Sequence, residues 1–277
     1  MTENKAVRIG LLGTGAIGRG LAIAADRGLI GQAKLTSVFD QYDYAAQSLL
    51  DQLEYKPDVY KTFLDFIGDD STSLIVEAAS QKAVIEYGPQ ILSSGKDMMI
   101  MSSGALLDTR CFEEMSRIQA LNGSRVFVPS GAVGGIDAIR ASKHELSEVT
   151  LTSRKPPNSL RDTEAPTPDH YSKLKSETIV FEGNAIDAVR RFPANTNVAA
   201  TVSLAGLGPE KTLVRVIADP KATRNSHEIY AKGASGVMRF TMENVPDPGN
   251  PMTSYMAILS AIETLRMAIG GVIKIGT

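Results

Sequence analysis

Apolar runs alternate with helical patterns through the first half of this chain. Val7, Ile9, Leu11 and Leu12 form a short run typical of a buried strand, and apolar residues at helical spacing follow it up to Asp26. Four further buried strands are predicted, at residues 33–39, 72–79, 97–101 and 125–128, with helices between them. This alternation predicts a doubly wound α/β domain with a parallel sheet.

A period of two replaces the buried runs from Val149 onward. Residues 149–154 and 237–243 alternate between apolar and polar side chains, and Gly233-Ala234-Ser235-Gly236 is a plausible hairpin connection. The pattern predicts a mainly antiparallel sheet with one solvated face. A helix is predicted over residues 136–146, and an exposed, mobile loop over 156–168, which are rich in proline and charge.

The end of the chain is predicted to be helical over residues 253–269. One face of this helix carries apolar residues, namely Tyr255, Ile258, Leu259, Ile262, Leu265 and Ile269. The whole pattern therefore predicts two domains. We expect a Rossmann-type doubly wound α/β domain over residues 1–130, a second, α+β domain over 131–250 and a C-terminal helix within 251–277.

Composition narrows the classes of partner. The chain has 277 residues, 43% of them hydrophobic and 22% charged, and a formal charge of −2, so no basic surface favours nucleic acid or a membrane. A single cysteine excludes an internal disulfide, and three scattered histidines lack the spacing of a zinc site, so no metal is expected. No apolar run reaches membrane-spanning length and the first residues lack a secretory pattern, so we expect a cytoplasmic protein acting on a small molecule.

The strongest chemical motif is the glycine-rich turn after the first strand, Gly13-Thr14-Gly15-Ala16-Ile17-Gly18. Gly13 permits a sharp turn, Gly15 lets a pyrophosphate approach the backbone, and Gly18 lets the helix pack closely on the strand. Asp40 follows the second strand and is suitably placed to bind a ribose hydroxyl. We therefore predict that this turn and Asp40 bind a dinucleotide, against the alternative of a structural glycine turn.

Other candidates lie at the carboxyl ends of later strands and beyond. The bare backbone of residues 129–135, PSGAVGG, is predicted to approach the nicotinamide, although an interdomain hinge would also explain it. Of the histidines, His144 and His170 are expected to be exposed, His144 on a helix. His227 shares its predicted face with Ile229 and Ala231 and should point inward, either as a proton-transferring group or as a structural histidine.

Several long motifs resemble the L-aspartate dehydrogenase family. They occur in order over essentially the whole chain, as GTGAIG (13–18), VPSGAVGGIDAI (128–139), SRKPP (153–157), FEGNAIDAVRRFPANTNVAATVSLAGL (181–207), RVIADP (215–220), NSHEIYAKGASG (225–236) and NPMTS (250–254). The resemblance implies NAD(P)-dependent oxidative deamination of L-aspartate to oxaloacetate and ammonia through iminosuccinate, or the reverse amination. A link to NAD biosynthesis is a further implication at the level of the family.

The resemblance also implies roles for particular residues. His227 corresponds to the catalytic histidine, and Ala132 and Asn197 to residues that contact the nicotinamide part of the cofactor. The family has a dinucleotide-binding domain, here residues 1–130, and a substrate-binding and catalytic domain, here residues 131–250. The C-terminal helix is expected to return to the first domain, and the family suggests a homodimer.

The cofactor and the substrate contacts are less well determined. Many members of the family have arginine after the acidic residue of the second strand, whereas Gln41 follows Asp40 here, so we expect NAD to be preferred while NADP remains possible. Arg154, Lys155, Ser102 and Ser103 are candidates for binding the substrate carboxylates. Two alternatives remain open: a related amino- or imino-acid oxidoreductase, and a protein that senses NAD without turning anything over.

Overall fold

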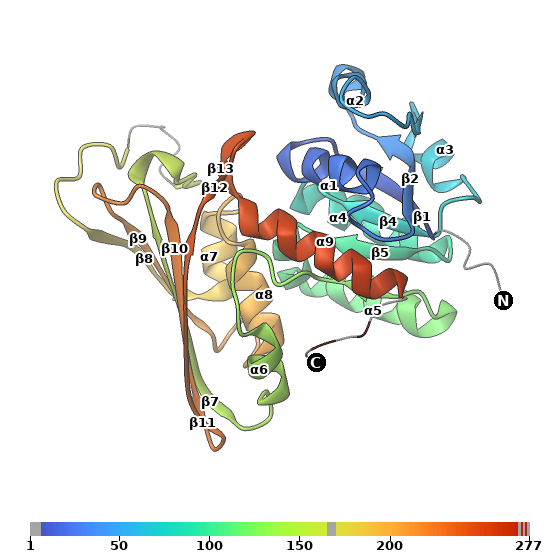
Figure 1. The fold of residues 1–277 in the computed structure, drawn as a ribbon. Coiled ribbons are helices and arrows are strands. Elements are labelled where there is room, and N and C mark those ends of the chain that lie inside the picture. Colours follow the sequence, from blue (N-terminus) through green and yellow to red (C-terminus); the bar gives the residue numbers. More distant parts are fainter. Residues whose placement is uncertain (1–6, 165–169, 271–272, 274, 276–277) are drawn as a thin grey trace. The chain divides into compact units, whose positions relative to one another are not determined.

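A computed structural model describes residues 7–164, 170–270, 273 and 275 of the chain. The described residues divide into two compact units. The first lies within Met1–Pro129 and Ile258–Lys274, and the second within Ser130–Ala257 and Ile275–Thr277. Each unit has its own sheet (Figure 1).

The first unit is built on a six-stranded sheet whose neighbouring strands are all parallel. Its strands lie in the order β3-β2-β1-β4-β5-β6, which is the doubly wound arrangement that the sequence predicts. The strands are β1 (Val7–Leu12), β2 (Ala33–Phe39), β3 (Asp58–Val59), β4 (Leu74–Glu77), β5 (Asp97–Ile100) and β6 (Val126–Phe127). The predicted buried runs correspond to these strands, except for the exposed edge strand β3, which was not predicted.

Helices cover both faces of this sheet (Figure 1). They are α1 (Ala16–Asp26), α2 (Asp43–Leu50), α3 (Phe63–Ile67), α4 (Gln81–Ser93), the 3-10 helix η1 (Ser103–Leu107), α5 (Thr109–Asn122) and α9 (Tyr255–Ile269). On one face, Leu21 of α1 and Leu265 of α9 belong to the same buried cluster as Val76 and Met99 of the sheet. Helices α4 and α5 pack against each other, with Met115 beside Gly88.

Helix α9 buries a narrower face than the sequence predicted. Ile258, Ala261 and Leu265 are buried, as is expected of positions three and four residues apart. Tyr255 and Leu259, which were expected on the same face, are exposed. The prediction was wrong for these two residues because the buried face is centred on Ile258, Ala261 and Leu265, and Leu259 lies about 100° around the helix from Ile258.

The second unit contains a five-stranded sheet in the order β11-β10-β7-β9-β8. Only β7 and β9 are parallel neighbours, so the sheet is mainly antiparallel, as predicted. The strands are β7 (Leu146–Lys155), β8 (Thr178–Asn184), β9 (Leu213–Ala218), β10 (Asn225–Gly233) and β11 (Gly236–Asn244), and a separate pair consists of β12 (Pro246–Asp247) and β13 (Asn250–Ser254). Gly233 pairs with Gly236, which confirms the predicted hairpin.

Three α-helices and a short 3-10 helix accompany this sheet. They are α6 (Ile136–Ala141), the 3-10 helix η2 (Pro157–Ser159), α7 (Ala185–Arg191) and α8 (Asn197–Ala205). Helix α8 packs on β7, α7 packs on β8 and β9, and α6 packs on α8. The helix predicted over residues 136–146 is too long: it ends at Ala141, and His144 lies exposed in the turn before β7 rather than on a helix.

The loop predicted over residues 156–168 is not exposed throughout. Leu160 and Asp162 are buried, and the Arg191 guanidinium pairs with the Asp162 carboxylate at 2.9 Å. This pairing lowers the pKa of Asp162, together with a hydrogen bond that the Tyr171 hydroxyl donates to it, although burial acts in the opposite direction. The prediction of an exposed loop was therefore wrong at Leu160 and Asp162, because the charge of Asp162 is paired with Arg191 and not solvated. Residues 165–169 lie outside the described residues.

Candidate functional site

The glycine-rich turn joins β1 to α1, and its three glycines meet different surroundings. Gly13 has a φ of +94°, and a Cβ built there would lie 2.7 Å from the Cβ of Ala79. A Cβ on Gly18 would lie 2.1 Å from the carbonyl oxygen of Gly13. No heavy atom lies within 4 Å of a Cβ built on Gly15. Two glycines are thus required by packing, and the middle one borders open space that a ligand can enter.

Helix α1 begins at Ala16 without a capping side chain. Gly15 is the N-cap residue, no side chain accepts a hydrogen bond there, and the first turn has no acidic residue. The N–H groups at the start of a helix lack intrahelical acceptors, so those of Ala16 and Ile17 are suited to an anion. The turn of Gly13 to Gly18, which was predicted to bind the cofactor, therefore has a geometry that a pyrophosphate could use.

Asp40 follows the last residue of β2 and contacts the same turn. Its Oδ2 accepts hydrogen bonds from the backbone N–H of Thr14 at 2.7 Å and from the Thr14 hydroxyl at 2.8 Å. Its Oδ1 accepts one from the backbone N–H of Tyr42 at 3.0 Å. A carboxylate has about four lone-pair sites, so Oδ1 keeps one for a further donor such as a ribose hydroxyl.

A pocket of about 290 Å³ opens beside Asp40 at the carboxyl ends of the strands. Its lining includes Gly13 and Gly15 from the turn, and Tyr42, Lys82 and Glu86 from the segments around it. This is the edge at which doubly wound sheets bind nucleotides. The open space at Gly15, the uncapped helix and the spare acceptor of Asp40 fit a dinucleotide.

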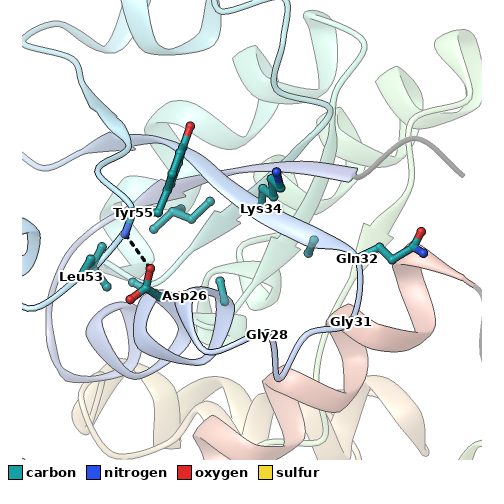
Figure 2. Close-up of a pocket in the computed structure, with 11 residues that line it drawn as sticks. Asp26, Gly28, Gly31, Gln32, Lys34, Leu53 and Tyr55 are labelled. Carbon is teal, nitrogen blue, oxygen red and sulfur yellow. Dashed lines mark hydrogen bonds between the residues drawn. The ribbon is translucent and has the colours of Figure 1, made fainter. Parts of the chain in front are cut away.

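A larger pocket of about 480 Å³ lies at the other end of these strands (Figure 2). It is lined by Gly28, Gly31 and Lys34 near the start of β2, and by Asp26 and Tyr55. The Asp26 carboxylate accepts hydrogen bonds from the backbone N–H groups of Glu54 and Tyr55, which lower its pKa. The Asp26 carboxylate thus fixes the backbone at Glu54 and Tyr55. The pocket itself lies away from the glycine-rich turn.

Glu77 is a buried carboxylate that the sequence analysis did not identify. It ends β4, and it accepts hydrogen bonds from the backbone N–H and the hydroxyl of Ser102 at 3.0 and 2.8 Å and from the N–H of Ala79 at 2.8 Å. Burial raises its pKa. Glu77 therefore ties together the connections that follow β4 and β5. The acidic residue at the end of the apolar run LIVE was the available signal.

His227 lies on β10 in the second unit and is 3% exposed. Ile229 and Ala231 are buried with it, as the alternation predicts. His227 is paired with Ser153 of β7, and the Ser153 hydroxyl lies 2.9 Å from Nδ1 of the imidazole. When Nδ1–H donates to this hydroxyl, Nε2 is left as a proton acceptor.

Lys155 is buried two residues beyond Ser153 on the same strand face. Burial, followed by the charge of Lys155, lowers the pKa of His227 to about 3, so the imidazole is neutral at pH 7. Burial also lowers the pKa of Lys155 to about 8. From the sequence, Lys155 was expected only as one of several candidates for binding the substrate carboxylates. The period of two along its strand, counted from Ser153, could have placed it beside His227.

Ala132 and Asn197 belong to the same unit as His227. Ala132 is buried in the turn before α6, and its carbonyl oxygen accepts a hydrogen bond from the Asn244 side-chain amide at 2.9 Å. Gly135 ends this turn with a φ of +78°. Asn197 is the first residue of α8, the helix that packs on β7.

Known proteins are similar to this chain over nearly its whole length. The chain is 42% identical over 274 residues to an L-aspartate dehydrogenase of Nitrosopumilus maritimus, a match that covers 98% of this chain and 99% of that protein. This chain belongs to the L-aspartate dehydrogenase family. Another member, the L-aspartate dehydrogenase of Methanosarcina mazei, is 44% identical over 276 residues, with 98% and 100% coverage.

Family models and a solved structure agree with this membership. Residues 137–268 match the model described as aspartate dehydrogenase, C-terminal, and residues 13–129 match that of the homoserine dehydrogenase NAD-binding domain. The crystal structure of aspartate dehydrogenase from Thermotoga maritima superposes with a TM-score of 0.77 at 29% identity, covering 97% of this chain and 99% of that one. The resemblance inferred from the motifs is therefore confirmed.

Proposed function

We propose that this protein is an NAD(P)-dependent L-aspartate dehydrogenase. The proposal rests on the sequence identity of 42% and 44%, over nearly the full length, to proteins of that name. It is supported by a pocket whose glycine-rich turn and Asp40 fit a dinucleotide. The reaction converts L-aspartate, NAD⁺ and water into oxaloacetate, ammonium, NADH and a proton, and it passes through iminosuccinate. The reverse reaction aminates oxaloacetate.

The bound nicotinamide supplies the hydride acceptor, and the chain must handle the protons. We assign His227 as the general base that takes a proton from the water adding to the imine carbon. Its neutral imidazole can accept that proton at Nε2 while Nδ1–H remains bound to the Ser153 hydroxyl. The buried surroundings keep the ring in one orientation.

The remaining predicted residues are assigned to the cofactor. The backbone of Gly13, Gly15, Ala16, Ile17 and Gly18 would bind the pyrophosphate, and Asp40 a ribose hydroxyl. Ala132 and Asn197 are proposed to contact the nicotinamide part, where the Asn197 amide can both donate and accept hydrogen bonds.

An assay of NADH formation with a panel of amino acids tests the proposal. We expect turnover with L-aspartate alone. Turnover with another amino acid instead would favour a related oxidoreductase, and binding of NAD without any turnover would favour an NAD-sensing protein. The His227→Ala variant should keep its fold and its affinity for NAD but lose about 100-fold or more in kcat. Near-normal turnover of that variant would contradict the role of His227.

NAD is proposed to be preferred over NADP, because the Asp40 carboxylate borders the pocket and would repel a 2′-phosphate. Gln41 has no charge to offset this repulsion. Lys82 lines the same pocket, so NADP can remain a weaker cofactor. The same assay, run with each cofactor, compares the two values of kcat/KM.

A homodimer in the cytoplasm is the proposed state of the enzyme. The family resemblance supports the dimer, and the single cysteine, with no partner in the chain for a disulfide, fits a reducing compartment.

Among the described residues, no helix has the length and apolar content to span a membrane, and no group of three histidine, cysteine or acidic residues could hold a metal ion.

A further inference from the structure

Lys155 is a buried cation on the strand face that carries His227. Lys155 and Ser153 alternate along β7 on the buried side, and His227 is the cross-strand partner of Ser153. Lys155 is 6% exposed, although it ends its strand. The sheet thus gathers a hydroxyl, an imidazole and an ammonium on one face.

No carboxylate pairs with Lys155 within the part of the chain that the structure describes. The other buried lysine, Lys96, differs: its Nζ donates to the carbonyl oxygens of Asp69 and Thr72, both at 2.8 Å. The neighbouring Arg154 pairs with Glu177 and Asp219. A buried ammonium without an anion costs free energy, so its presence beside His227 indicates an anion that binds there.

We propose that Lys155 binds a carboxylate of the substrate and holds it next to His227. The proposal rests on the proposed function, because L-aspartate and iminosuccinate each carry two carboxylates and the reaction needs both ends of the substrate held. An ion pair formed in this buried position is strengthened by the low local dielectric constant.

Binding of a carboxylate at Lys155 would also change the proton affinity of His227. The positive charge of Lys155 disfavours a second positive charge on His227. A substrate carboxylate neutralises that charge and makes His227 a better proton acceptor. The base would therefore gain strength when the substrate is in place.

The Lys155→Met variant tests this assignment, with Lys232→Met as the matched control, because Lys232 lies exposed on β10 of the same sheet. We expect Lys155→Met to raise the KM for L-aspartate by about 10- to 150-fold, the range of a hydrogen bond to a charged group. The KM for NAD should change less than about twofold, and the ligand-free variant should melt at a higher temperature than the wild type, because the unpaired charge is gone.

Succinate, a dicarboxylate without the amine, provides a readout that needs no turnover. It should raise the melting temperature of the wild type and of Lys232→Met but not that of Lys155→Met. Equal stabilisation of all three, or an unchanged KM for L-aspartate, would overturn the role of Lys155. If Lys155→Met does not fold, Lys155→Gln removes the same charge and carries the same expectations. A wild type that binds succinate through Lys155 but does not oxidise L-aspartate would contradict the proposed function and leave the carboxylate site standing.

Discussion

The proton affinity of His227 is determined by its place on β10. The imidazole is buried beside Lys155 and Ser153, and both burial and the lysine charge favour its neutral form. In an unfolded chain the same histidine has a pKa of about 6.5. Folding therefore suppresses protonation, and the stability of the protein is coupled to pH through this residue.

This coupling predicts acid sensitivity. The stabilisation is fully present above pH 6.5 and is lost as the pH falls towards the folded pKa of about 3, at about 1.4 kcal/mol per pH unit. Lys155, with a pKa of about 8, stays protonated in this range. Urea unfolding at pH 6.5 and 4.5 should show that His227→Asn loses about 2–3 kcal/mol less than the wild type. The exposed His144→Asn control should behave as the wild type, and equal losses in all three proteins would contradict the prediction.

Single residues of the site differed in how well the sequence revealed them. His227 was predicted to point inward because, at every second position of the strand, it shares a face with the apolar residues Ile229 and Ala231. Lys155 and Glu77 were not recognised as buried, because a charged residue at a strand end is usually solvated. Their burial depends on which elements cover them, and local pattern does not contain that information.

The β1–α1 connection is the element on which the proposed cofactor binding depends. Two of its glycines have different roles. Gly18 packs against the carbonyl of Gly13, whereas Gly15 faces open space. The motif itself could be predicted from the sequence, but this division of roles needed the packing of α1 against the turn.

Two alanine substitutions separate these roles. Gly18→Ala should lower the free energy of unfolding by about 1–3 kcal/mol, because its Cβ overlaps backbone that cannot move freely. Gly15→Ala, at a φ of −65° that alanine tolerates, should leave stability nearly unchanged and weaken NAD binding by about tenfold or more. Urea unfolding and titration with NAD measure the two effects. A Gly15→Ala variant that binds NAD normally would show that the open space is not used.

Short elements were the least predictable part of the fold. The edge strand β3 has only two residues, both exposed, so it has no apolar run to detect. Helix α6 ends at Ala141 because the following residues turn into β7, whereas the apolar spacing alone favoured a longer helix. The long elements β10 and α9 were recognised because periodicity accumulates with length, although the buried face of α9 was predicted too wide.

At the scale of the whole molecule, the nucleotide-binding unit is built from both ends of the chain. Helix α9 contributes Ile258, Ala261 and Leu265 to the cluster that also contains residues of β1 and α1. Gly20 of α1 makes room for Ile258, since a Cβ there would lie 2.9 Å from its Cδ1. The proposed cofactor site therefore depends on the packing of α9.

Leu265→Ala tests this dependence. Removal of a fully buried leucine side chain should cost about 2–5 kcal/mol in the free energy of unfolding. Leu259→Ala, on the exposed side of the same helix, should cost less than about 0.5 kcal/mol. Denaturant unfolding monitored with bound NADH fluorescence would report both. Similar losses in the two variants would mean that α9 does not stabilise this unit through its buried face.

The dependence on α9 reverses the usual order of maturation during synthesis. Domains generally complete themselves from the N-terminus as they leave the ribosome. Here the residues of the second unit, up to Ala257, emerge before Ile258 does. The apolar face that α9 covers on β1 and α1 therefore stays uncovered until α9 has left the ribosome. A nascent chain of this protein can finish its second unit first, and the nucleotide-binding unit, although started earliest, is the last to be completed.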